Sequence, residues 1–271
     1  MHKMFSKVYS AFYFACADDG IGRFDRSMLS QQELMELFIF GLNEPEKICG
    51  NRDDPDDVCE WKGVTCNADG EVEEFHWNNK QQAGTLGFEF LLCSMKTLYM
   101  FMNDLSGTIQ LGDLPGRMKK LSLFSNNLIG SLDFDTLPAD VQALNLSRNK
   151  FTGEICLENL PKCLESLSLS KNQLSGAICL TALPPALEYL HLHKNNFEGS
   201  LDFTQLPNYI RNIMLYENRF SGTIDLGNLP ESMERFDVTK HALSGTVRVP
   251  KQVYRKGDRS FRFGGNMNLI V

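Results

Sequence analysis

The sequence has no apolar run approaching the roughly eighteen residues that a membrane-spanning helix needs. It also has no surplus of positive charge, since 27 Lys and Arg stand against 34 Asp and Glu in 271 residues. Because nucleic-acid binding needs a basic face, this acidic balance argues against a nucleic-acid partner. The composition predicts one elongated soluble domain without a membrane span.

The sequence also lacks the motifs of catalysis. It contains no nucleophile motif, phosphate-binding loop, dinucleotide fingerprint or HExxH metal motif. We therefore expect no enzyme activity, no cofactor and no metal. One metal alternative stays open, because His191 and His193 share one face of a predicted strand and Glu217 could be a third ligand. Nothing in the sequence positions that third ligand, so ordinary surface histidines are the default interpretation.

What the sequence does contain is a repeat of 23 residues without insertions. Most copies begin with an apolar-x-apolar pair, followed by Asn at position five, Gly at position nine and Leu-Pro at positions sixteen and seventeen. The copies start at Leu98, Leu121, Leu144, Leu167, Leu190, Ile213 and Phe236. An atypical copy begins at Phe75. A period in this range predicts a solenoid in which stacked coils share one core.

Each recurrent residue has a predicted structural role. The apolar pair points into the coil from a short strand, and the residue between its members faces outward. The Gly suits a bent or closely packed backbone, and the Asn amide can bind backbone groups inside the turn. The Asn column comprises Asn103, Asn126, Asn149, Asn172, Asn195 and Asn218. We predict eight repeats over residues 75–250 and a partial ninth strand within residues 251–271.

These repeats resemble the plant-specific type of extracellular leucine-rich repeat, LxxLxLxxNxLxGxI, over about two thirds of the chain. The segment CEWKGVTC, at residues 59–66, resembles the CxWxGVxC cap of plant receptor kinases and polygalacturonase-inhibiting proteins. The resemblance implies a right-handed α/β-type solenoid with parallel strands on its concave face, a helical N-terminal cap, and a Cys59–Cys66 disulfide. The chain departs from that family in its shorter period and in lacking a kinase or membrane segment.

The N-terminal region has two predicted parts. Residues 1–17 have a basic start, a short apolar stretch and small residues at a plausible cleavage point, which indicates a signal peptide. The alternative is a helical or unstructured tail. Residues 18–74 would form the cap, in which the capping box of Ser30 and Glu33 predicts a helix of about twelve residues.

The cysteines and one sequon bear on the compartment. Cys156 and Cys179 occupy the same offset in adjacent coils, so we expect neighbours that could form a bridge, whereas Cys49, Cys93 and Cys163 have no assignable partner. Asn145 begins the only N-x-Ser/Thr acceptor, on the outward side of a strand. A secreted or secretory-pathway protein is expected, with a cytoplasmic one as the alternative.

The outward strand positions supply the candidate binding residues. Small polar residues occupy the middle coils, and larger side chains gather on either side of them. We predict ligand-binding residues Tyr99, Phe101 and Phe124 toward the N-terminus and Tyr189, His191, His193, Met214 and Tyr216 toward the C-terminus. Grouped exposed aromatics usually mark interaction sites. The alternative is incidental surface composition.

The expected function is non-catalytic recognition of a protein or peptide on the concave face. Two other interpretations stay open. One is an intracellular scaffold or assembly subunit, which predicts an intact Met1 and free thiols. The other is an inhibitor of a secreted hydrolase or a carbohydrate binder, which predicts binding of an enzyme or of sugar polymers.

Overall fold

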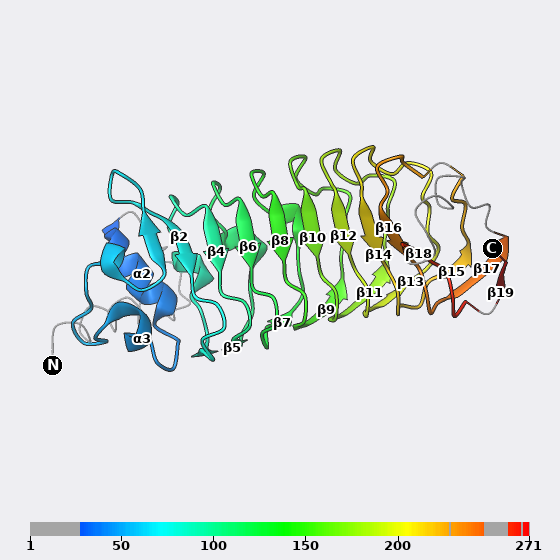
Figure 1. Cartoon of the computed structure of the whole chain (residues 1–271). Coiled ribbons are helices and arrows are strands. Elements are labelled where there is room, and N and C mark those ends of the chain that lie inside the picture. Colours follow the sequence, from blue (N-terminus) through cyan, green and yellow to red (C-terminus); the bar gives the residue numbers. More distant parts are fainter. Residues whose placement is uncertain (1–27, 228, 247–259, 267, 271) are drawn as a thin grey trace, which may run out of the picture.

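Repeated coils stack along one axis to form an elongated solenoid (Figure 1). The computed structural model describes residues 28–227, 229–246, 260–266 and 268–270. The predicted signal peptide, residues 1–17, lies outside the described residues. Within the described part of the chain, no helix combines the length and apolar character that crossing a membrane requires.

One ten-stranded sheet runs the length of the solenoid. Its first two strands are antiparallel and the others are parallel. Leu98 pairs with Leu121, which pairs with Leu144, so each strand lies one 23-residue period from the next and the predicted register is confirmed. In order, the strands are β1 (Val64–Cys66), β2 (Val72–His76), β4 (Thr97–Tyr99), β6 (Lys120–Ser122), β8 (Ala143–Asn145), β10 (Ser166–Ser168), β12 (Tyr189–His191), β14 (Asn212–Met214), β16 (Arg235–Asp237) and β18 (Phe261–Arg262).

Further parallel strands form smaller sheets on a second side of the coils, which the sequence analysis did not anticipate. They come from the residues around the recurrent Gly, where the chain is extended and pairs with the next coil. The strands are β3 (Ala83–Gly84) with β5 (Asp104–Leu105); β7 (Ile129–Gly130), β9 (Lys150–Glu154), β11 (Gln173–Ala177) and β13 (Asn196–Glu198); and β15 (Ser221–Thr223), β17 (Ala242–Thr246) and β19 (Asn268–Ile270). Short 3₁₀ turns connect the early coils at η2 (Val58–Glu60), η3 (Phe88–Phe90), η4 (Leu111–Asp113) and η5 (Phe134–Thr136).

The Asn column joins neighbouring coils. Asn149 donates from Nδ2 to the carbonyls of Leu123 (3.0 Å) and Leu146 (3.1 Å), and its Oδ1 accepts from the Leu128 N–H at 3.0 Å. The other five Asn side chains repeat these three contacts in their own coils. Each buried Asn amide therefore forms hydrogen bonds with backbone groups of two neighbouring coils, and the Asn column has a structural role in holding the coils together.

The Gly column has the bent backbone that the sequence predicts. From Gly84 to Gly222 its seven members all have φ between 80° and 112°, a region that side chains disfavour. Gly84 has a second constraint, because an added Cβ would lie 2.3 Å from the Gly41 carbonyl oxygen. This contact is where the N-terminal cap reaches the first coil, through a bridge between Leu42 and Gly84.

The N-terminal cap closes the open end of the core with two helices, α2 (Gln31–Ile39) and α3 (Glu46–Cys49). The capping box of Ser30 and Glu33 is confirmed, although α2 has nine residues rather than about twelve. Phe38 of α2 packs edge-on against Phe75 of the first coil, with ring centroids 6.3 Å apart. Cys59 and Cys66 are bonded, as the resemblance implied.

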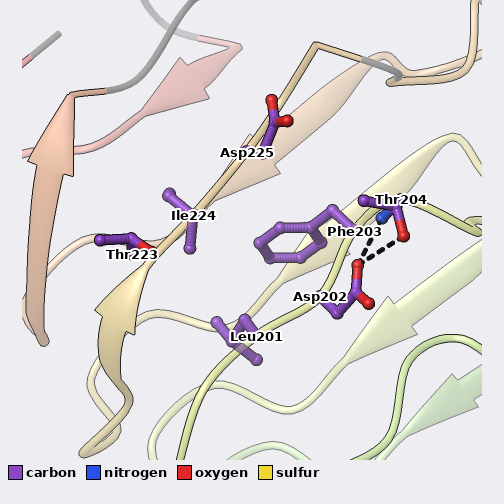
Figure 2. A pocket seen from close by; sticks show the side chains of 7 residues that line it. All are labelled: Leu201, Asp202, Phe203, Thr204, Thr223, Ile224 and Asp225. Atoms are coloured by element: carbon purple, nitrogen blue, oxygen red, sulfur yellow. Dashed lines mark hydrogen bonds between the residues drawn. The ribbon is translucent and has the colours of Figure 1, made fainter.

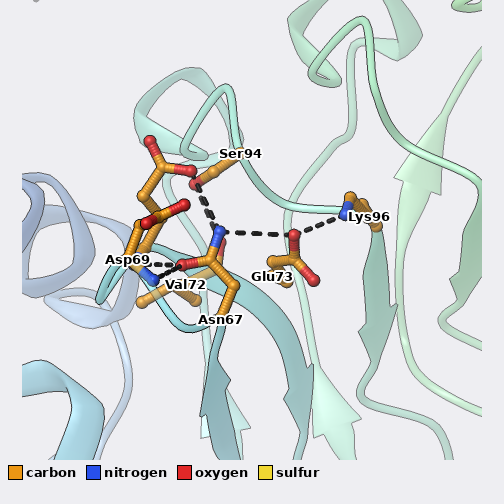
Figure 3. A network of polar contacts seen from close by, with 7 residues as sticks. Asn67, Asp69, Val72, Glu73, Ser94 and Lys96 are labelled. Atoms are coloured by element: carbon orange, nitrogen blue, oxygen red, sulfur yellow. Dashed lines mark hydrogen bonds and ion pairs between the residues drawn. The ribbon is translucent and has the colours of Figure 1, made fainter.

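A polar network ties the cap hairpin to the next coil (Figure 3). The Asn67 side chain closes the turn between β1 and β2, accepting from the N–H groups of Asp69 and Glu71 at 3.0 and 2.9 Å. Its Nδ2 also lies 3.4 Å from Glu73, and Glu73 pairs with Lys96 of the following coil. The hairpin is therefore held to the repeat array by polar as well as apolar contacts.

At the other end, β18 pairs with β16, so a ninth strand is present. Asn266 repeats the Asn role there, with Nδ2 donating to the carbonyls of Val238 (2.9 Å) and Phe263 (2.6 Å). His241 takes the Asn position of the eighth coil, where its Nδ1 accepts from the Asn218 N–H at 3.2 Å.

The possible bridge between Cys156 and Cys179 is not formed, since both are free thiols, as are Cys49, Cys93 and Cys163. The Cys179 thiol contacts the Thr181 hydroxyl at 3.2 Å instead. Equal offsets placed the two residues in adjacent coils, but a disulfide also needs side chains that point toward each other.

Candidate functional site

The outward side of the ten-stranded sheet, here called the strand face, presents the predicted binding residues. Side chains alternate along each strand, so residues two apart face the same way. The in-register ladder then aligns them across coils: Tyr99 lies opposite His76 and Ser122, and His191 lies opposite Ser168 and Met214. All eight predicted ligand-binding residues lie on this face, and all are half-buried.

His76, Tyr99, Phe101 and Phe124 form the first ring cluster. The rings of His76 and Tyr99 are stacked with centroids 4.9 Å apart, and Tyr99 lies 6.3 Å from Phe101. Phe101 lies 5.9 Å from Phe124, whose ring is covered by the Arg148 guanidinium at 5.8 Å. Contacts between rings of neighbouring strands fix these side chains in place while leaving each ring partly exposed to solvent. His76 and Arg148 were not among the binding residues predicted from the sequence.

His191, His193 and Tyr216 form the second ring cluster. His193 stacks on Tyr216 with centroids 4.3 Å apart, and the two histidine rings lie 6.3 Å apart. Met214 lies opposite His191 in the ladder. Tyr189 is also on the strand face, between Ser166 and Asn212 in the ladder, but we do not count it in the second ring cluster.

The second ring cluster holds its histidines neutral. Burial lowers the pKa of His193 to about 4, with further lowering from His191 and from Lys171 and Lys194. Burial also lowers the pKa of His191, and Arg235 adds to that effect. The Nε2 of His191 and the Nδ1 of His193 are buried without a hydrogen-bond partner. A neutral imidazole can donate and accept, so each of these buried atoms leaves one hydrogen-bonding position of its ring without a partner.

Between the clusters, the strand face carries small polar side chains. Ser147, Ser168 and Ser170 are buried, and the Ser168 hydroxyl lies 3.2 Å from that of Ser147. Asn145, the glycosylation candidate, is half-buried, and its Oδ1 accepts hydrogen bonds from Ser147. The middle coils therefore form a stretch of short side chains flanked by larger ones.

The alternative metal site does not assemble. Among the described residues, no three His, Cys, Asp or Glu side chains come together to hold a metal ion. Glu217, the third ligand of that hypothesis, pairs instead with Lys194 (3.4 Å) and Lys240 (2.7 Å).

A pocket lies away from the strand face (Figure 2). It forms between the turns that follow β13 and β15, and it is lined by Leu201, Asp202, Phe203, Thr204, Thr223, Ile224 and Asp225. The Asp202 carboxylate accepts from the Thr204 hydroxyl at 2.7 Å and from its N–H at 2.9 Å, which keeps the pKa of Asp202 below its usual value. These contacts close a turn, and they give the pocket no reactive group.

Comparison with known proteins identifies the fold. No family model matches the chain, and no curated protein matches its sequence. One similar structure is the leucine-rich-repeat ectodomain of the Arabidopsis thaliana receptor kinase GASSHO1/SCHENGEN3 in complex with CASPARIAN STRIP INTEGRITY FACTOR 2. The match covers 86% of this chain and 29% of that ectodomain, with a TM-score of 0.69 and 24% sequence identity. PEPR1 with AtPEP1 matches 88% of this chain and 42% of its own length, with a TM-score of 0.60 and 21% identity.

A plant ice-binding protein matches 89% of this chain and 95% of its own length, with a TM-score of 0.53 and 20% identity. The chain therefore spans less than half the length of the GASSHO1/SCHENGEN3 and PEPR1 chains, whereas the ice-binding protein is of similar size. The solenoid fold is that of plant leucine-rich-repeat ectodomains, as the repeat pattern indicated.

Proposed function

We propose that this protein is a non-catalytic recognition module that binds an extended peptide or protein segment on its strand face. One observation carries the proposal: the two ring clusters lie on the same face of one sheet, each held by neighbouring rings and each half-exposed. Aromatic side chains supply much of the energy of protein recognition because they bury a large area for few rotatable bonds.

The distance between the clusters suits an extended ligand. Phe124 and His193 are three coils apart in the array, since Ser147 and Ser170 occupy the same column between them. At about 4.8 Å per strand the separation is roughly 14 Å, which an extended chain crosses in about four residues. A peptide of moderate length can therefore contact both clusters and cover the short side chains between them.

Similarity of fold supports this use of the solenoid. The GASSHO1/SCHENGEN3 structure contains CASPARIAN STRIP INTEGRITY FACTOR 2, and the PEPR1 structure contains AtPEP1. Both show that a solenoid of this type can bind a ligand. The class of ligand and its position on this chain are proposed from the residues of the strand face.

We also propose that the protein works outside the cell or in the secretory pathway. The Cys59–Cys66 bond supports an oxidising compartment, because cytosolic thiols are kept reduced. One mass spectrum of the native protein, taken with and without reduction, tests this proposal. A chain lacking residues 1–17 that gains the mass of two hydrogens on reduction is expected, and a glycan on Asn145 would add to its mass. An intact Met1 with all thiols free would favour the intracellular scaffold.

The binding proposal is tested by selecting peptides from a random phage-displayed library on the full chain. Selected peptides should lose most of their binding to a Phe101→Ser, Phe124→Ser, Tyr216→Ser variant. The matched control is Ile129→Ser with Tyr209→Ser, which removes large exposed apolar groups outside the strand face. Thermal unfolding would show that each variant is folded. Binding unaffected by the strand-face substitutions, or selection of no peptide, would contradict the proposal.

A further inference from the structure

A column of cations borders the stretch between the ring clusters. Arg148, Lys171 and Lys194 each directly precede an Asn of the buried column, and they occupy the same place in three consecutive coils. Their backbones are left-handed, with φ of 54°, 56° and 59°. That conformation costs roughly 1–2 kcal/mol per non-glycine residue. The side-chain hydrogen bonds of the Asn that follows each cation keep the backbone in this conformation.

The ladder keeps these three positions on adjacent rungs. The Arg148 N–H donates to the Ser170 carbonyl at 2.8 Å, and the Lys171 and Lys194 N–H groups donate to the His193 and Tyr216 carbonyls at 2.9 Å. Successive rungs lie about 4.8 Å apart, so three positive charges are held close together. Like charges at such separations repel, and an intervening anion relieves the repulsion.

The column is only partly neutralised by the protein. Lys194 has Glu217 at 3.4 Å, but Glu217 also binds Lys240. The ion pairs among the described residues include neither Arg148 nor Lys171, and the Arg148 guanidinium lies over the Phe124 ring, 5.8 Å from its centroid. Burial lowers the pKa of Lys171, Arg148 and Lys194 lower it further, and Glu217 opposes these effects. This local positive charge occurs in a chain with a net charge of −7.

We propose that the cation column, Arg148, Lys171 and Lys194, binds an acidic side chain of the peptide whose apolar neighbours contact the two ring clusters. The inference rests on the proposed function and specifies its ligand: an extended segment with Asp or Glu between apolar or aromatic residues. The Arg148 guanidinium can hold a carboxylate through two N–H groups, and the Lys171 ammonium contributes a point charge.

The phage-displayed random peptide library, selected on the full chain, tests the inference separately from the proposed function. We expect the selected peptides to be enriched in Asp or Glu at positions between apolar residues. Enrichment of peptides without acidic residues would overturn the inference and leave the proposed function standing. Selection of no peptide would overturn both.

Synthetic versions of the selected peptides then test the residues. An Arg148→Ala, Lys171→Ala variant should bind the acidic peptide about tenfold more weakly and should bind its Gln- or Asn-substituted form as wild type does. The matched control is Lys150→Ala with Lys162→Ala, two exposed lysines whose loss changes the net charge equally. Equal weakening by both variants would indicate a general charge effect and overturn the assignment.

Discussion

The two ring clusters occupy the same columns of the same sheet, yet their chemistry differs. In the first, Tyr99, Phe101 and Phe124 present mainly carbon to the solvent, and Arg148 covers the last ring. In the second, two neutral histidines carry buried ring nitrogens without partners. The coil therefore determines where an outward side chain stands, but it leaves the chemistry of that side chain free to vary.

The difference has an energetic meaning. Burying rings that carry no unpaired polar atom is favourable, whereas a buried polar atom without a partner costs about 1–3 kcal/mol. The second ring cluster therefore carries the cost of two unpaired buried nitrogens, which the first ring cluster does not.

The largest effect should come from disconnecting the clusters. Asn149 lies in the coil between them, and Asn149→Ala would leave the Leu123 and Leu146 carbonyls and the Leu128 N–H without their partner. Because these groups are buried, we expect the free energy of unfolding to fall by about 3 kcal/mol or more. Urea unfolding measures this, with the exposed Lys150→Ala as control. A fall no larger than that of the control would show that the Asn column does not hold the coils together.

Removing the disulfide should affect the first ring cluster more than the second. A Cys59→Ser, Cys66→Ser variant loses the cross-link of a short loop next to β2, and we expect a loss of about 2 kcal/mol. Hydrogen exchange should accelerate in β2 and β4 and change little in β12 and β14. Cys93→Ser, which removes an exposed free thiol, is the control. Equal acceleration along the whole sheet would contradict this local effect.

Acid should affect the second ring cluster selectively. The folded pKa of His193 is about 4, below the unfolded value of about 6.5, so the unfolded chain takes up the proton first. The contribution of neutral His193 to stability is therefore complete above about pH 6.5 and is lost as the pH falls toward about 4. His193→Gln should reduce the drop in melting temperature between about pH 6.5 and pH 5, whereas Met214→Leu should not. An unchanged drop in His193→Gln would contradict this assignment.

The smallest effect should be the coupling between a ring and the cation above it. A double-mutant cycle of Phe124→Ala and Arg148→Ala should give a coupling free energy of about 0.5–1 kcal/mol. The same cycle on Tyr216 and Lys194 should give less, because Lys194 is also paired with Glu217. Chemical unfolding of the single and double variants measures both, and a coupling at Tyr216 and Lys194 larger than that at Phe124 and Arg148 would contradict the comparison.

Much of the fold could be predicted because its signals are local and recur. The position of Asn149 and the spacing of Leu121 and Leu144 repeat a pattern, so each copy supports the interpretation of the others. The second set of sheets was missed because its strands include small and polar residues, such as Ser175 and Gly176, whose pairing comes from the stacked coils rather than from an alternating pattern.

The candidate site was predicted in part. The eight outward residues follow directly from strand alternation, and the structure places them all on the strand face. Arg148 and Lys171 were missed because they lie just after the strands, at a left-handed position where alternation gives no direction. Their place immediately before the recurrent Asn was the available signal.

The sequence by itself determined the coil, its register and the face on which each outward residue stands, because these depend on a period that short-range sterics and apolar burial enforce in every copy. Only the tertiary structure decided which outward side chains touch, which nitrogens are left without partners, and which cations form ion pairs. Those properties depend on rotamers and on neighbours in adjacent coils as well as in the same coil, and burial and charge there act through space rather than along the chain.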